Sequence, residues 1–256
     1  GCGVNKSSFS PNKTYSLLEV QKDYAVYQNT LQAHHPSLYW YNSKDSIEYY
    51  FDWGRRQLKD SLTEPQFRRI LSYVTSKINC GHSSVRSSKA WAKYSDTVRL
   101  GKMFPLSLKI WNDTAVVSAN LNRKDTVLKR GTMIATINGN PLPVIIDTMF
   151  NYISSDGYNV THKYQSLSNR GFFGSLYTSL FGLSDKYTVE YKDSSGQLKK
   201  VMIPVYNPVA DTPVRTSGPR PVIRNIPQPS KEERKQQRLN SVRLLKIDSV
   251  NHTAMM

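Results

Sequence analysis

The stretch INCGHSS, residues 78–84, places one histidine between a glycine and a pair of serines, where a helical pattern ends. The imidazole of His82 can take up a proton at neutral pH, so it could act as a general base toward a serine hydroxyl. Two other roles stay open from the residues alone: a histidine that favours a helix C-terminus, or a metal ligand. No second histidine or carboxylate stands nearby at ligand spacing, so the sequence predicts no metal site and no cofactor.

Cys2 is a second residue with a possible chemical role. It follows a small residue and precedes a polar stretch that includes Asn5, Lys6 and Ser7. This arrangement resembles a bacterial lipoprotein just after its cleavage point, which would make Cys2 a lipid attachment site and locate the protein in the cell envelope. The alternative is an ordinary disordered terminus with a chance cysteine. No apolar run approaches the roughly 20 residues that span a bilayer, so lipid on Cys2 is the expected link to a membrane.

The chain carries a formal net charge of +16. Such a charge suggests attraction to nucleic acid or to an anionic surface. Residues 215–243 hold eight of the basic residues against Glu232 and Glu233, which points to a solvated segment rather than a patch on a folded face. No aromatic-basic recognition motif is present, so the sequence does not favour nucleic acid as a partner.

Amphipathic helices are predicted in the first third of the chain, because apolar residues recur there three and four apart. The first helix covers residues 16–32 and is stopped by Pro36. The second starts at residues 43–45, where Asp45 and Glu48 have the spacing of a capping box.

The apolar side of the second helix is expected to continue to Leu62, and a third helix is expected to begin at Thr63. Gly81 stands where a left-handed helix end is expected. The sequence thus predicts a helical unit that ends immediately before His82.

From Phe104 onward the apolar period changes from about 3.6 to 2, which predicts strands. Strands are expected over 104–110, 114–119 and 133–137, followed by an Asn138-Gly139 turn and a helix over 141–153. Residues 154–185 are expected to be an irregular insertion.

A β-hairpin is expected around residues 193–196, and the proline-rich, basic stretch 207–240 reads as an extended linker. Residues 241–248 are expected to form a strand, and a further strand opens in the last residues. The fold class is therefore α+β.

The order of these elements resembles the front half of the C-terminal-processing (tail-specific) serine peptidases, in the envelope form found in Bacteroidetes-type bacteria. The stretches that carry the resemblance are HPSLYWY (residues 35–41), INCGHSS, FPLSLKIWNDTAVVSAN, KRGTMIATINGNPL and SVRLLKIDSVNHTAMM. It implies a tether over 1–15, a helical domain over 16–97, a PDZ-like domain over 98–206 with the insertion, the linker, and the start of a protease core over 241–256.

The resemblance also implies roles for individual residues. In the branch of the family that uses histidine, Gly-His followed by a small hydroxyl residue supplies the general base, and His82 matches that position. A PDZ-like groove binds a peptide as an added strand, and the residues expected to line it are Phe104, Leu106, Ser107, Leu108, Ile145 and Met149. Each of these six could equally be a core residue. Pro105 has no amide hydrogen, so one of the usual donors to a terminal carboxylate is absent from this edge.

The family's nucleophile lies in its core domain, so the chain is expected to be the front part of an enzyme and inactive alone. The favoured function is recognition of a peptide or protein substrate for cleavage by its own C-terminal protease domain. Two alternatives are a non-catalytic adaptor of the cell envelope and a nucleic-acid binder. The insertion, with Phe172, Phe173, Tyr177 and Phe181, could cover the groove as a lid or pack against the protease domain.

Overall fold

The computed structural model describes residues 9–98, 101–112, 114–209, 230–242, 246–248 and 253–255. The chain divides into two compact units, residues 1–212 and 213–256. Helices and strands are mixed, so the expected α+β class is confirmed. No helix in the described ranges is both long and apolar enough to cross a membrane.

Three helices open the first unit: α1 (Leu17–His34), α2 (Lys44–Arg56) and α3 (Glu64–Ser76). All three predicted helices are confirmed. Each begins at a residue with extended backbone, and both α1 and α3 have a capping box, in which the side chains of the cap and of the third helical residue satisfy the first amides. Buried apolar residues of the three helices, such as Phe51 and Val74, pack together.

Three local details differ from the sequence predictions. The cap of α2 is Ser43, which accepts a hydrogen bond from the amide of Ser46, so Asp45 is not the cap. Leu62 lies in the short strand β2 (Leu62–Thr63), which pairs with β1 (Thr14–Tyr15), and not on α2. The left-handed residue after α3 is Asn79, with φ of 56°, and not Gly81. Asparagine tolerates this conformation better than most residues do.

A short helix, α4 (Lys89–Thr97), connects the helical part to an antiparallel sheet. The strands follow the order β3-β4-β5-β7-β8, and β6 pairs with β5. Their bounds are β3 Leu106–Trp111, β4 Thr114–Asn120, β5 Met133–Ile137, β6 Asn140–Pro141, β7 Lys186–Lys192 and β8 Leu198–Pro204. The predicted strands and the hairpin are confirmed.

The tight turn between β5 and β6 has positive φ at both Asn138 and Gly139, as a two-residue hairpin turn requires. The predicted helix follows as α5 (Leu142–Phe150). Residues 154–185, expected to be irregular, contain the helices α6 (Thr161–Leu167) and α7 (Phe172–Phe181). Both contact β3. The prediction failed here because these helices are short and gain their stability from tertiary packing rather than from a sequence period.

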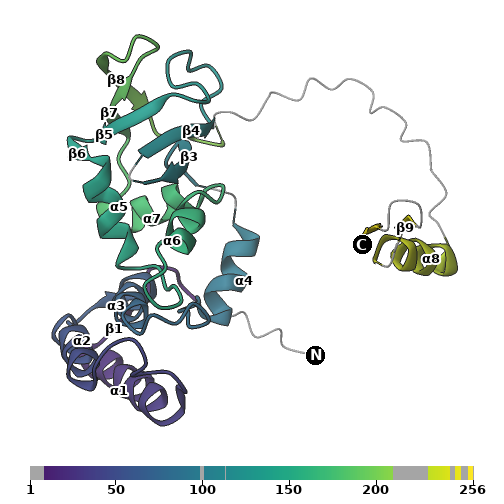
Figure 1. Ribbon diagram of the computed structural model, residues 1–256. Helices are drawn as coiled ribbons and strands as arrows, with labels where there is room; N and C mark the ends of the chain where they lie inside the picture. The colour runs from purple at the N-terminus through teal and green to yellow at the C-terminus, as the bar shows by residue number, and fades with distance from the viewer. Residues whose placement is uncertain are drawn as a thin grey trace, which may run out of the picture. The chain divides into compact units, whose positions relative to one another are not determined.

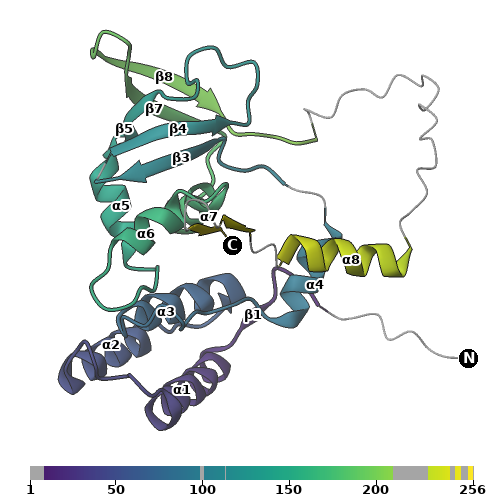
Figure 2. The same cartoon turned by 45° about the vertical axis from the view of Figure 1, so that its right-hand side comes forward.

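The first unit is layered. Figures 1 and 2 show the sheet, then α5, α6 and α7, and then the layer of α1, α2 and α3. The main core lies between the sheet and α5–α7, and smaller apolar clusters lie among α1–α3. Ser76 and Lys77, at the end of α3, donate hydrogen bonds to the backbone and the side chain of Asn151, which caps α5. The helical layer is therefore attached to the second layer through the ends of two helices.

The second unit contains α8 (Lys231–Val242) and the paired strands β9 (Lys246–Asp248) and β10 (Thr253–Met255). The helix occupies the end of the stretch that was expected to be an extended linker. It continues into the region 241–248 that was expected to be a strand, where β9 confirms the strand over Lys246–Asp248. The predicted final strand is confirmed as β10. Ser230 stands before this helix, and its hydroxyl accepts a hydrogen bond from the amide of Glu233, so the helix has a local start signal.

Candidate functional site

The turn that carries His82 is tied to the segment that follows α5. The amide of Gly81 donates to Oδ1 of Asp156 at 2.7 Å, and the amide of Gly157 donates to the carbonyl oxygen of Asn79 at 2.8 Å. A Cβ on Gly81 would lie 3.0 Å from the Asp156 carboxylate. Glycine at position 81 therefore allows the close approach that fixes this turn.

His82 is exposed at the end of this turn. Its imidazole makes no hydrogen bond with any residue in the described part of the chain. Within the same part, no three histidine, cysteine or acidic side chains gather closely enough to hold a metal ion. The side chain is thus accessible to a group from outside the described structure. A general base that acts on a nucleophile in another domain needs this accessibility.

A different histidine pairs with a serine of the same turn. Nε2 of His35 lies 2.8 Å from Oγ of Ser83, and Nδ1 of His35 accepts a hydrogen bond from the amide of Ser37 at 3.3 Å. Because Nδ1 is the acceptor, the proton of the neutral ring is on Nε2, which then donates to Ser83. His35 therefore cannot serve as a base toward Ser83 in this arrangement, and the contact holds the turn in place.

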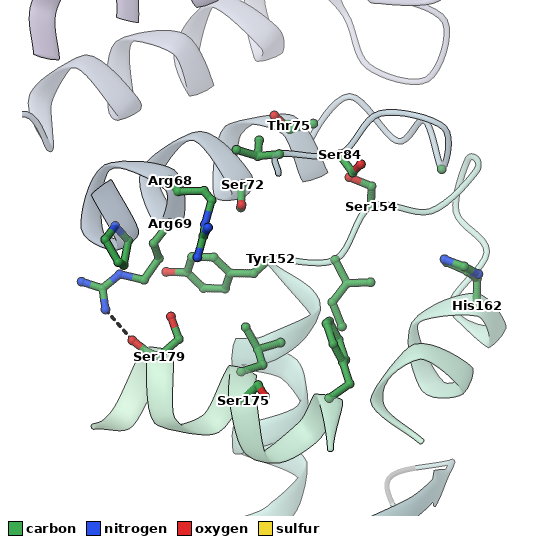
Figure 3. A pocket seen from close by; sticks show the side chains of 16 residues that line it. Arg68, Arg69, Ser72, Thr75, Ser84, Tyr152, Ser154, His162, Ser175 and Ser179 are labelled. Carbon is green, nitrogen blue, oxygen red and sulfur yellow. Dashed lines mark hydrogen bonds between the residues drawn. The ribbon is translucent and has the colours of Figure 1, made fainter. Parts of the chain in front are cut away.

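A pocket of about 440 Å³ lies beside this turn, between α3 and α7. Its size is in the range typical of ligand sites. The residues that line it are Pro65, Arg68, Arg69, Ser72, Thr75, Gly81, Ser84, Val85, Tyr152, Ile153, Ser154, His162, Phe172, Ser175, Leu176 and Ser179. Figure 3 shows Arg68 and Ser72 reaching from α3 toward Tyr152, with Ser175 and Ser179 on the opposite wall. The pocket lies between the layer of α1–α3 and the layer of α5–α7, and residues of both layers line it.

The wall of this pocket is rich in hydroxyl groups and contains two guanidinium groups. Nη1 of Arg69 donates to the carbonyl oxygen of Ser179 at 2.6 Å, near the C-terminal end of α7. Burial raises the pKa of Tyr152, and the positive charge of Arg69 partly opposes that rise. The Tyr152 hydroxyl therefore stays protonated at neutral pH and can donate a hydrogen bond.

The six residues expected to line a PDZ-like groove are all buried. Their exposed fractions range from 0% for Ile145 and Met149 to 5% for Ser107. The others are Phe104, Leu106 and Leu108, at 3%, 1% and 1%. In this structure all six side chains are core residues, as the alternative interpretation of the sequence had it, and none of them is exposed to a ligand.

The outer edge of β3, where a peptide would be expected to add as a strand, is covered by the insertion. Oγ of Ser168 accepts a hydrogen bond from the amide of Ile110 at 2.9 Å. Gly174 of α7 sits against Phe104, and a Cβ there would lie 3.2 Å from the Phe104 Cβ. Met103 is already paired with Tyr206 through two backbone hydrogen bonds. With Pro105 lacking an amide hydrogen, few backbone donors remain at this edge.

Cys2, the predicted lipid attachment site, lies outside the described residues. Cys80 is a free, partly buried cysteine at the start of the His82 turn. The residues of the pocket between α3 and α7 were not predicted from the sequence. A signal was available, because Arg68, Ser72 and Thr75 are spaced four and three apart and so share one face of α3.

Comparisons with known proteins show a distant similarity of fold. No protein-family model matches the chain, and no curated protein matches it significantly. Solved structures of CPAF, a chlamydial serine protease with the tail-specific protease-like fold, do match. The structure of a serine-to-alanine mutant of CPAF has 13% identity and a TM-score of 0.51, over 75% of this chain and 34% of its own. The structure of mature CPAF complexed with lactacystin has 11% identity and a TM-score of 0.51, over 74% and 35%.

The chain spans about a third of the length of these solved structures, 34% in the first comparison. At 13% identity the likeness concerns the fold and not the activity. The described fold is therefore distantly similar to part of a serine protease fold.

Proposed function

We propose that this chain is the N-terminal, substrate-recognition portion of a serine endopeptidase of the C-terminal-processing type. The observation that carries the proposal is the likeness of 75% of the chain to about a third of a serine protease structure. Neither the helical part nor the sheet part makes up half of the chain. A structural match over 75% of the chain must therefore include residues of both parts. The catalytic nucleophile would then come from a protease core in the full-length protein.

The sheet and α5 are proposed to be the PDZ-like module. Support comes from the succession of the β3–β4 strand pair, the tight Asn138-Gly139 turn and a helix immediately after it. Because α6 and α7 cover the β3 edge, peptide binding along that edge would require the insertion to move. If the insertion stays in place, a peptide would instead bind in the pocket beside the His82 turn.

His82 is proposed to be the general base. Its support is the exposed imidazole, which has no hydrogen-bond partner among the described residues, on a turn that Asp156 holds in place. Removing a general base lowers the rate about 10²- to 10⁴-fold. We therefore expect His82→Ala in the full-length protein to lower kcat for peptide hydrolysis by that factor, with an unchanged melting temperature.

His34→Ala is the matched control for this experiment, because His34 is also exposed and lies at the end of α1. It should leave kcat unchanged. Full activity of the His82→Ala variant would rule out the base role. A full-length protein that binds peptides but hydrolyses none would instead support the adaptor alternative.

We also propose that Cys2 carries lipid and holds the protein at the cell envelope. The support is the small residue before Cys2 and the polar stretch after it. Metabolic labelling with an alkyne fatty acid should mark the wild-type protein and not a Cys2→Ser variant. Equal labelling of both would contradict the proposal.

A further inference from the structure

The pocket between α3 and α7 contains a guanidinium group, that of Arg68, which makes no hydrogen bond within the described part of the chain. The carboxylate oxygen nearest to Arg68 is Oε1 of Glu64, at 4.0 Å, which is beyond hydrogen-bond distance. The Glu64 oxygens already accept hydrogen bonds from the amide and the hydroxyl of Ser88, both at 2.7 Å. The Arg68 side chain is only 29% exposed. Among the described residues, its N–H groups therefore have no hydrogen-bond acceptor, although the group is partly removed from water.

Hydroxyl groups around Arg68 are also unpaired. Within the described ranges, no hydrogen bond is formed by the Tyr152 hydroxyl or by five serine hydroxyls on the pocket wall, which belong to Ser72, Ser84, Ser154, Ser175 and Ser179. Figure 3 shows Arg68 and Ser72 pointing from α3 toward Tyr152. Ser84, Ser175 and Ser179 are exposed, so their hydroxyl groups are open to a ligand in the pocket as well as to water.

The lining of the pocket is basic, and the carboxylate nearest to it is that of Glu64, which forms an ion pair with Arg68 at 4.0 Å. None of the residues that line the pocket is acidic, and two are arginines. A neighbouring pocket of about 540 Å³ shares Arg69 and Tyr152 with it, adds Arg56 and Lys59, and again has no acidic lining residue. The two pockets therefore form a cationic surface on either side of Arg69 and Tyr152. Such a surface attracts an anionic ligand.

We propose that this pocket binds a carboxylate of a peptide, with Arg68 as its main contact. A guanidinium group matches a carboxylate by two parallel hydrogen bonds. Ser72, one turn after Arg68 on the same face of α3, and Tyr152 line the same pocket and supply further hydroxyl donors, and the serines of α7 can bond the peptide backbone. The inference rests on the proposed function, since it names acidic peptides as the class of substrate that this part recognises.

The carboxylate can come from a glutamate or aspartate side chain or from a peptide C-terminus. Three fluorescent peptides distinguish these sources: a glutamate-rich peptide with a C-terminal amide, the same peptide with glutamine in place of glutamate, and the glutamine peptide with a free C-terminal carboxylate. Binding is measured by fluorescence anisotropy on the full chain. The glutamate peptide should bind at least about tenfold more tightly than its amidated glutamine counterpart, and less tightly as salt is raised. Tight binding of the third peptide would assign the terminal carboxylate as an additional source.

Arg68→Gln tests the contact. This variant should weaken binding of the carboxylate peptide by about tenfold or more, because a charge-assisted bidentate contact is lost. Arg130→Gln is the matched control, because it removes the same charge from an exposed position outside both pockets. It should change the Kd by less than about twofold. Circular dichroism and thermal melting check that both variants fold.

A second variant keeps the test valid if Arg68→Gln is unstable. Ser72→Ala combined with Tyr152→Phe removes two donors and leaves the charges in place, and it should also weaken binding of the carboxylate peptide. Equal affinity for the glutamate and amidated glutamine peptides, or unchanged binding by the Arg68→Gln variant, would overturn the proposal. Tighter Arg68-dependent binding of a single-stranded oligonucleotide would overturn it in favour of nucleic acid.

The peptide test and the test of the proposed function fail separately. Hydrolysis of an uncharged peptide by the full-length protein reports the protease role without the pocket. If that hydrolysis occurs and the carboxylate peptides show no preference, only the pocket assignment is lost. If the carboxylate peptides bind through Arg68 and no peptide is hydrolysed, the pocket assignment stands and the protease role is lost.

Discussion

At the scale of single residues, two histidines near one turn have different environments. His82 is exposed and unpaired within the described structure, whereas His35 is held between Ser83 and the amide of Ser37. A base needs a free lone pair directed at its proton donor. The His35 ring uses its lone pair on a backbone amide, so it contributes to the geometry of the turn. Of the two, only His82 has the freedom that catalysis would require.

The environment of His35 predicts a pH dependence. Burial lowers the pKa of His35, so between that pKa and about 6.5, the usual value, the unfolded chain binds more protons than the folded chain. The contribution of neutral His35 to the free energy of unfolding should therefore be complete above about pH 6.5. It should be lost progressively as the pH falls below that value.

The measurement is the free energy of unfolding from urea titrations between pH 5 and 8. We expect His35→Gln to reduce the loss at low pH relative to wild type. His34→Gln, the exposed neighbour, should keep the wild-type dependence. Identical pH profiles for the His35→Gln variant and wild type would contradict the prediction.

At the scale of elements, α7 determines what the sheet offers to a ligand. Its buried residues Phe173 and Tyr177 belong to the main core, and their rings lie 5.7 Å and 5.0 Å from that of Phe104. Gly174 lets the helix approach Phe104 directly. The helix is therefore a part of the core that also closes the edge of β3.

Gly174→Leu should destabilise the protein by about 1–3 kcal/mol, because a larger side chain must displace either α7 or Phe104 in a packed core. Helix propensity favours leucine over glycine by about 1 kcal/mol, which offsets only part of this cost. Urea denaturation would measure the effect. Ser175→Leu, on the exposed side of the same helix, should stay within about 0.5 kcal/mol of wild type. A fully stable Gly174→Leu variant would show that α7 does not pack as described.

At the scale of the whole molecule, the described core is confined to the first unit. Among the residues whose burial the structure describes, every buried apolar residue lies between Val20 and Ile203, and the contacts divide the chain after residue 212. Since folding stability comes mainly from such burial, the first unit carries what it needs to fold.

A chain ending at residue 212 should therefore melt within about 3 °C of the longer chain, the shift that roughly 1 kcal/mol produces in a domain of this size. Calorimetry would measure the two melting temperatures. A chain ending at residue 197 is the control: it lacks β8, which pairs with β7 along its whole length, and should not fold. A large loss of stability on truncation at residue 212 would show that the second unit supports the first.

Much of the fold could be predicted because its signals are local. Apolar residues three and four apart specified α1 to α3, alternation specified β3 and β4, and the Asn138-Gly139 pair specified a turn. These features depend on backbone preferences and on one buried face, which neighbouring residues determine. The capping of α2 was misassigned by two residues, because serine and aspartate are both good caps and only the backbone conformation decides between them.

The candidate site could be predicted only in part. Gly81 and His82 were singled out by residue type, but the pairing of His35 with Ser83 joins residues that are 48 positions apart. The pocket brings together α3 and α7, which are separated by about a hundred residues in the sequence. No local pattern reports such a contact.

The sequence alone determined the class of the fold, most of its elements and the choice of His82, after the third helix, as a candidate base. The tertiary structure decided which apolar residues are core, and it placed the expected groove residues under α6 and α7. It also decided that two arginines and several hydroxyl groups share one pocket. The physical reason is that local preferences fix helices and strands, whereas burial and the pairing of charges depend on which distant surfaces meet.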